Sequence, residues 1–191
     1  IPAYNESARI GNTLDVLLKY LQSLGISYEV VVVDDGSTDT TRDEVERYVG
    51  RCPGRIRLLS HSINRGKGAA VRTGVLNARG AVICFLDADM ATPIDAIGNA
   101  WRLLRTGYGI VIGKRHGRKK QDAVRRLLGS AFTLLSNMVL GTHVSDFTCG
   151  FKMFTRESAI PLFSSARLND WSFDAEILFL ARRCGFKIYE M

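Results

Sequence analysis

Over its first 112 residues the chain alternates continuous apolar runs with amphipathic stretches. The run at 29–33, which is apolar from Val30 onward, and the run at 81–86 are rich in β-branched residues, as expected of strands that are covered on both faces. Shorter runs at 56–59 and 108–112 predict two further strands. Strands separated by helices are typical of an α/β fold with a mainly parallel sheet flanked by helices, which is the fold class that we predict.

The amphipathic stretches between these runs predict helices, at about 7–24, 38–49, 67–79 and 93–106. In the first of them leucines recur at helical spacing between Leu14 and Leu21, so one face is expected to be buried. After Gly113 the pattern changes to a basic loop followed by further elements, a helix at about 123–140, a strand at about 150–155 and a helix at about 172–184.

The organisation of the chain is predicted to be one domain over 1–191, in two parts, 1–112 and 113–191. No linker rich in Pro, Gly or Ser separates these parts, and no internal repeat is visible. Both ends are expected to be truncated, because the chain starts at Ile1 without a methionine and stops within an apolar run at 187–191. No run of 18 uncharged apolar residues predicts a transmembrane span within the chain.

Composition supports one well-buried domain, since 46% of the 191 residues are apolar, and it excludes a disordered or fibrous chain. The net charge of +7 is concentrated between 114 and 126, where seven basic residues accompany one acid. A local basic strip predicts an anionic partner such as a phosphate, a nucleic acid or a membrane surface. The four cysteines are far apart in sequence, so reduced thiols are expected, with neither a disulfide framework nor a zinc site.

Acidic residues follow three of the predicted strands, in the segments 2–6, 34–39 and 87–89. Ligands of open α/β sheets bind beyond the carboxyl ends of strands, where several carboxylates repel one another unless ligands or cations compensate them. The Asp-x-Asp pair of Asp87 and Asp89 suits a hard divalent cation that also binds phosphate. A plainer alternative for Asp39 is that it only caps the helix that follows.

The glycine-rich loop 64–70 follows the third strand and starts a helix. Its glycines let backbone N–H groups approach a diphosphate, and Arg65 and Lys67 add positive potential. The loop lacks the spacing of a P-loop, and the first strand lacks the glycine pattern of dinucleotide-binding folds. A simple helix-starting turn is the alternative.

Taken together, the segments 2–6, 34–39, 64–68 and 87–89 resemble, in order and spacing, the inverting GT-A glycosyltransferases of family 2 that make polyprenyl-phosphate sugars. The segments 145–156 and 171–176 are similar to the dolichyl-phosphate β-glucosyltransferase branch of that family, with the mannosyl branch next. The resemblance covers nearly the whole chain. It implies that 1–112 binds a nucleotide sugar and that 113–191 forms the acceptor side.

The resemblance also assigns site residues. Those implied to bind the nucleotide sugar are Pro2, Tyr4, Glu6, Asp34, Asp35, Lys67, Asp87 and Ala88. Those implied to be catalytic are Asp89, Arg115, Arg126 and Asp146. Asp89 and Asp87 would bind Mg²⁺ or Mn²⁺, whereas Ala91 stands where mannosyl enzymes have a third, glutamine ligand. The absence of the Gln-x-x-Arg-Trp signature of processive synthases argues for a single transfer.

The basic strip fits an acceptor phosphate. A phosphate monoester has a second pKa of about 6, so its oxygen needs positioning cations, here Arg115 and Arg126, more than a base. The three histidines are expected to be surface or structural residues. The nearly uncharged stretch 127–140 fits an interfacial helix on anionic lipid, and an ordinary core helix equally well.

Four residues near the C-terminal end are open to two interpretations. Asp174 and Glu176 are candidates to aid the acceptor or the sugar, although a salt bridge is the plainer role of Glu176. Trp171 and Phe173 are expected to belong to the core rather than to a sugar platform.

The predicted reaction is transfer of glucose from UDP-glucose to a polyprenyl (dolichyl) phosphate with inversion, releasing UDP. The alternatives are a GDP-mannose-dependent enzyme with the same acceptor, a nucleotidyltransferase that releases pyrophosphate, and a non-catalytic module that binds nucleotide sugar or lipid. A nucleic-acid partner is not expected, because no aromatic stacking pattern accompanies the cations. The protein is predicted to be membrane-associated with its site on the cytoplasmic side, at the endoplasmic reticulum if eukaryotic and at the plasma membrane if prokaryotic.

Overall fold

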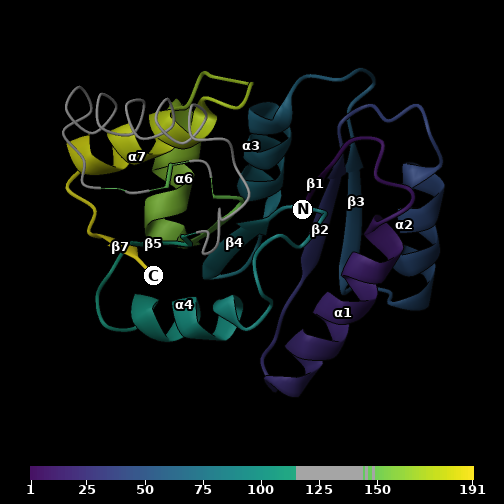
Figure 1. Cartoon of the computed structure of the whole chain (residues 1–191), viewed down its shortest axis with the longest axis horizontal. Helices are drawn as coiled ribbons and strands as arrows, with labels where there is room; N and C mark the ends of the chain where they lie inside the picture. The colour runs from purple at the N-terminus through teal and green to yellow at the C-terminus, as the bar shows by residue number, and fades with distance from the viewer. Residues whose placement is uncertain (115–143, 145, 148) are drawn as a thin grey trace, which may run out of the picture.

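The computed structural model describes residues 1–114, 144, 146–147 and 149–191, which form a mixed α/β structure (Figure 1). In chain order its elements are β1 (Pro2–Ala3), α1 (Ile10–Ser23), β2 (Val30–Asp34), α2 (Thr41–Arg51), β3 (Ile56–Ser60), α3 (Lys67–Asn77), β4 (Val82–Leu86), α4 (Ala96–Leu104), β5 (Ile110–Ile112), β6 (Phe151–Thr155), α6 (Arg156–Ser165), α7 (Phe173–Arg183) and β7 (Ile188–Glu190). Within this described part no helix is long and apolar enough to cross a membrane.

The first three strands form a parallel sheet in the order β1-β2-β3. Their register places Ala3 opposite Asp34 and Asp34 opposite Ser60, so all three strands end at one level. The loops that follow them therefore meet at the same edge of the sheet, as parallel pairing requires.

The remaining strands form a second sheet in the order β4-β6-β5-β7. Strand β6 runs antiparallel to both β4 and β5, whereas β5 and β7 are parallel. Three of the five pairs among the described strands are thus parallel, which confirms the predicted mainly parallel fold. Pairing of Leu86 with Phe151 brings the residues after β4 against those before β6.

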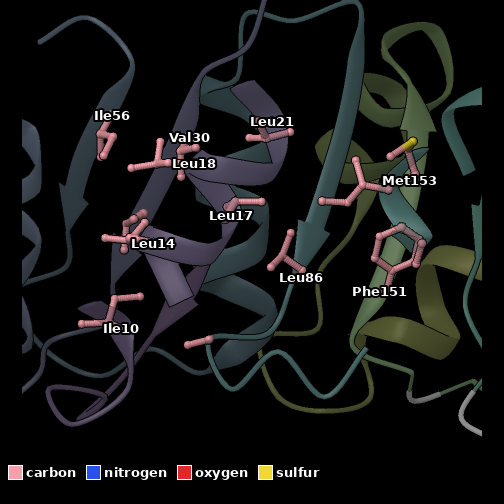
Figure 2. Close-up of a cluster of buried hydrophobic side chains, with 14 of the residues drawn as sticks. Ile10, Leu14, Leu17, Leu18, Leu21, Val30, Ile56, Leu86, Phe151 and Met153 are labelled. Atoms are coloured by element: carbon pink, nitrogen blue, oxygen red, sulfur yellow. The ribbon is translucent and has the colours of Figure 1, made fainter. Parts of the chain in front are cut away.

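One hydrophobic core joins the two sheets. The predicted stripe of α1 is buried, and it packs against Val30 of β2 and Ile56 of β3. Figure 2 shows that this cluster extends to Leu86 of β4 and to Phe151 and Met153 of β6. Each fully buried side chain of this kind stabilises the fold by roughly 1.5–3 kcal/mol. The shared core fixes the strand ends of the two sheets relative to each other.

A second core lies under α3, α6 and α7, where Phe154 contacts Phe163 edge to face with ring centroids 5.4 Å apart. Helix α6 was not predicted from the sequence, because Pro161 stands inside it and its apolar residues show little helical periodicity. Burial of Leu162 and Phe163 in this core holds the helix in place, and Thr155 caps it by accepting a hydrogen bond from the Ser158 N–H. The predicted helix at 123–140 lies outside the described residues.

Candidate active site

The loops after β1 and β2 interlock at the carboxyl edge of the first sheet. Asn5, which has a left-handed φ of 54°, accepts a hydrogen bond from the Thr38 N–H at 2.9 Å. Its own N–H donates to Ser37 Oγ at 3.0 Å. These bonds fix the β1 loop so that Tyr4 stands exposed at the edge, as a residue that contacts a nucleotide would. Glu6 is already paired with Arg9, at 2.7 Å.

Asp39 ties the same two loops together. Its carboxylate accepts hydrogen bonds from the Thr41 N–H at the start of α2 and from the Ser7 N–H in the β1 loop. Desolvation raises the pKa of Asp39, but the hydrogen bonds from Thr41 and Ser7 outweigh it and lower this pKa to about 2. Asp39 therefore does more than the helix-start alternative states: it precedes the N-cap Thr40, binds the first N–H of α2 and ties the helix start to the neighbouring loop.

The two adjacent acids after β2 differ in their surroundings, although both are buried. Asp34 accepts a hydrogen bond from the Ser37 N–H at 3.1 Å. Asp35 has both oxygens engaged, because Oδ1 accepts from the Arg65 N–H and Oδ2 accepts from the Gly66 N–H, at 3.0 and 2.8 Å. We therefore expect Asp35 to shape the site rather than to touch the nucleotide, whereas Asp34 stays a candidate ligand.

His61 links Asp35 to helix α3. Its Nδ1 lies 2.6 Å from Asp35 Oδ1, and its Nε2 lies 3.0 Å from Thr73 Oγ1 of α3. The side chain is only 7% exposed, which confirms the structural role expected of this histidine. The buried pair holds the glycine-rich loop against the end of β2.

The glycine-rich loop corrects one sequence interpretation. The N–H groups of Arg65 and Gly66 donate to Asp35, and those of Gly68 and Ala69 donate to the Asn169 carbonyl, at 2.7 and 3.3 Å. The prediction that these amides face a diphosphate is wrong, because the chain itself satisfies them. The glycines instead allow close packing, since a Cβ on Gly68 would lie 2.7 Å from the Leu168 carbonyl oxygen.

The side chain of Lys67 is the part of this loop that reaches the acids after β4. Its Nζ lies 2.6 Å from Asp87 Oδ1 and 4.7 Å from the centroid of the Trp171 ring. Asp87 Oδ1 is buried, and the Lys67 ammonium compensates its charge, although no described residue donates a hydrogen bond of good geometry to it. The Asp87 N–H donates to the Gly150 carbonyl, and the Asp87 carboxylate packs so closely on Gly150 that no Cβ fits there.

The rest of the Asp-x-Asp turn is held from below. Ala88 is buried, and its carbonyl accepts a 2.6 Å hydrogen bond from Thr13 of α1. Asp89 is exposed and accepts only the Ala91 N–H among the described donors, at 3.0 Å. The Asp87 carboxylate, which pairs with Lys67, and the exposed Asp89 carboxylate supply the oxygen ligands that a hard divalent cation prefers. The described residues contain no group of three metal-ligating side chains, so water or ligand phosphates would complete the shell of such an ion.

A buried lysine was missed by the sequence analysis. Lys152 is fully buried, and its Nζ donates to Asp174 Oδ1 at 2.6 Å and to the carbonyls of Phe147 and Cys149 at 3.0 and 2.8 Å. Burial raises the pKa of Asp174, and the ammonium of Lys152 opposes this shift. The available signal was a lone cation inside the apolar run 151–154.

The other predicted residues of the C-terminal part differ in their burial and contacts. Asp146 is 8% exposed, and its N–H donates to Glu190 Oε1. Glu176 accepts hydrogen bonds from the N–H groups of Arg167 and Leu168, and within the described residues these backbone contacts, not a salt bridge, are what its carboxylate makes. Several of the predictions fall outside the described residues: those for Arg115, Arg126, His116, His143 and the stretch 127–140.

Solved structures that resemble this chain show its fold. A glucosyl-3-phosphoglycerate synthase from Mycobacterium tuberculosis, solved with UDP, matches with a TM-score of 0.73 and 23% identity over 99% of this chain and 66% of that one. The Pyrobaculum calidifontis mannosyltransferase solved with GDP-Man and Mn²⁺ matches with a TM-score of 0.67 and 23% identity, over 100% and 52%. The fold is that of the GT-A glycosyltransferases.

The sequence profile of Glycosyl transferase family 2 matches residues 1–163, and the chain belongs to this family. It is 39% identical over 204 residues to a dolichyl-phosphate beta-glucosyltransferase of Trichomonas vaginalis, covering 100% of this chain and 62% of the relative. The Homo sapiens enzyme of that name is 34% identical over 208 residues, covering 100% and 64%. The resemblance drawn from the motifs is confirmed, and the chain spans slightly less than two thirds of these relatives.

Proposed function

We propose that this chain transfers glucose from UDP-glucose to a polyprenyl (dolichyl) phosphate with inversion, giving a lipid-phosphate glucose and free UDP. The observation that carries the proposal is the Lys67–Asp87 pair at 2.6 Å next to the exposed carboxylate of Asp89, on a glycosyltransferase fold. The names of the relatives support glucose and dolichyl phosphate over the mannose alternative. The neighbours solved with UDP and with GDP-Man support a nucleotide-sugar donor, and the uridine nucleotide is part of the proposal.

In this proposal the donor lies across the carboxyl ends of strands from both sheets. Tyr4 and Asp34 hold the base and ribose at the end of the first sheet, with Pro2 and Glu6 shaping the same loop. Lys67 lies near the diphosphate. Asp87 and Asp89 hold Mg²⁺ or Mn²⁺, which when bound stabilises the negative charge that develops on the leaving diphosphate. Structural neighbours solved with Mn²⁺ support a divalent ion.

The acceptor is activated mainly by position. Its phosphate oxygen is already largely deprotonated near pH 7, so the proposal needs no strong base in the chain. Attack on the anomeric carbon from the side opposite the diphosphate breaks the sugar–phosphate bond and inverts the configuration. Arg115, Arg126 and Asp146 are proposed to orient the acceptor phosphate. A lipid acceptor implies association with a membrane surface, and we infer a cytoplasmic orientation at the endoplasmic reticulum of a eukaryote or the plasma membrane of a prokaryote.

Nucleotide binding tests the donor half of this proposal. Asp34→Asn should weaken UDP binding about tenfold, because an amide accepts the N–H of the base less well than a carboxylate. Asp35→Asn is the matched control, because the Asp35 carboxylate neighbours that of Asp34 but is engaged by His61 and by two backbone N–H groups of the protein itself. It should lower the melting temperature while changing UDP affinity less than Asp34→Asn does.

Isothermal titration of UDP and GDP in the presence of Mn²⁺ measures both effects. Preference of the wild type for GDP over UDP would contradict the glucose assignment. Equal UDP affinity of wild type and Asp34→Asn would remove Asp34 from the nucleotide site.

A further inference from the structure

The side chain of Trp171 is 71% exposed, although the sequence predicted it in the core. Phe173, two residues later, is buried as predicted. A single exposed apolar side chain is common on protein surfaces and carries no argument alone. The loop that holds Trp171 and the neighbours of its ring distinguish this residue from an ordinary surface tryptophan.

The loop 166–172 is held firmly at several points by polar contacts. Arg72 of α3 donates to the Ala166 carbonyl and to Asn169 Oδ1, each at 2.9 Å. The Gly68 N–H donates to the Asn169 carbonyl, so the loop between α6 and α7 lies beside the start of α3 (Figure 1). Glu176 binds two further N–H groups of the loop.

The last residues of the loop are fixed as well, because Asp170 Oδ1 accepts from the Ser172 N–H at 2.8 Å. None of these bonds involves the indole of Trp171. Its large apolar ring is therefore presented on a rigid support without being buried by the fold, which is the arrangement of a preformed ligand contact.

The indole also borders the proposed donor site. Lys67 Nζ lies 4.7 Å from the ring centroid and 2.6 Å from Asp87 Oδ1, so the exposed ring stands next to the charges assigned to the diphosphate. A hexose has apolar C–H faces and polar hydroxyl edges. The indole face suits the C–H face, and the charged groups beside it suit the hydroxyls. The hexose is the part of a nucleotide sugar that follows directly on the diphosphate.

We propose that Trp171 is a wall of the donor site and packs against the hexose ring of the nucleotide sugar. This inference rests on the proposed function, because it requires a nucleotide-sugar donor. It adds a sugar-contacting residue to a set that otherwise addresses the nucleotide, the metal and the acceptor. It also predicts that Trp171 contributes to the binding of UDP-glucose but not of UDP, because UDP has no hexose.

The test compares UDP and UDP-glucose by isothermal titration with Mn²⁺, using the whole protein. Trp171→Ala should weaken UDP-glucose binding about five- to tenfold, the range expected for losing one aromatic packing contact, and should change UDP binding less than about twofold. Trp171→Phe should restore most of the UDP-glucose affinity. Leu168→Ala is the matched control, because it shortens another exposed apolar side chain of the same loop, and both ligands should bind it as they bind wild type.

Two results would overturn the inference. Equal weakening of UDP and UDP-glucose in Trp171→Ala would mean that the ring acts only through Lys67. Unchanged binding of both ligands, with a raised KM for the polyprenyl phosphate, would assign the ring to the lipid acceptor instead. Failure of the wild type to bind either nucleotide is a different outcome, because it would overturn the proposed function itself and the inference with it.

Discussion

Replacing Asp89 with alanine should lower the rate of glucose transfer at least about 100-fold while leaving the fold intact. The carboxylate is exposed and accepts only the Ala91 N–H among the described donors, so its removal costs the folded state little. Its proposed role is to hold the divalent cation together with Asp87. Steady-state transfer rates and circular dichroism melting curves measure the two effects separately.

Asp95→Ala provides the control for this prediction. Asp95 is an exposed acid a few residues away, at the start of α4, and its side chain makes no capping hydrogen bond. Its replacement should leave transfer near the wild-type rate. Near-normal transfer by Asp89→Ala, or by wild type with the divalent cations chelated, would rule out the metal assignment.

Replacing Lys152 with methionine should destabilise the protein by about 3–5 kcal/mol, the cost of leaving a buried charge without its partner. The change strands the Asp174 carboxylate and two backbone carbonyls that now accept from the Lys152 ammonium. For a domain of this length the melting temperature should fall on the order of 10 °C. Urea unfolding monitored by circular dichroism gives the free energy directly.

The double variant Lys152→Met/Asp174→Leu should recover much of this loss, because no unpaired charge stays buried.

The single variant Lys152→Met should also lose less stability, relative to wild type, near pH 4 than near pH 8. Burial raises the pKa of Asp174 and Lys152 opposes this rise, so removing Lys152 should raise the folded-state pKa further. As the pH increases above the unfolded-state pKa, the unfolded chain releases a proton that the folded variant keeps, and the stability of the variant declines. A loss below about 1 kcal/mol at pH 8 would show that the ion pair does not matter to the fold.

Local pattern was sufficient to predict most of the elements that position the site. The leucine stripe of α1 and the apolar runs of β2 and β4 need no partner to be recognised, because periodicity and continuity are properties of the segments themselves. The rule that ligands bind at the carboxyl ends of strands then pointed to Asp87, and the structure places Lys67 in contact with it. The antiparallel direction of β6 depends on pairing with distant strands, which a single segment does not encode.

The misinterpreted parts of the site depend on contacts between residues far apart in the chain. A loop with the sequence of 64–68 looks the same whether its amides face a ligand or the Asn169 carbonyl about a hundred residues later. Lys152 meets its partner only when α7 packs on β6. The exposure of Trp171 likewise depends on where its loop lies, next to Arg72 and Glu176, and the apolar character of the residue does not indicate it.

The most direct test of the proposed function is the identity of the lipid product. The purified protein is incubated with dolichyl phosphate, Mn²⁺ and either UDP-glucose or GDP-mannose, each labelled in the sugar, and the released nucleotide and the extracted lipid are analysed by mass spectrometry. The proposal predicts free UDP and a glucosyl phosphate lipid with inverted anomeric configuration from UDP-glucose, in a reaction that Asp89→Ala prevents. Release of pyrophosphate, a mannosyl lipid formed from GDP-mannose alone, or UDP release without a glycosylated lipid would contradict it.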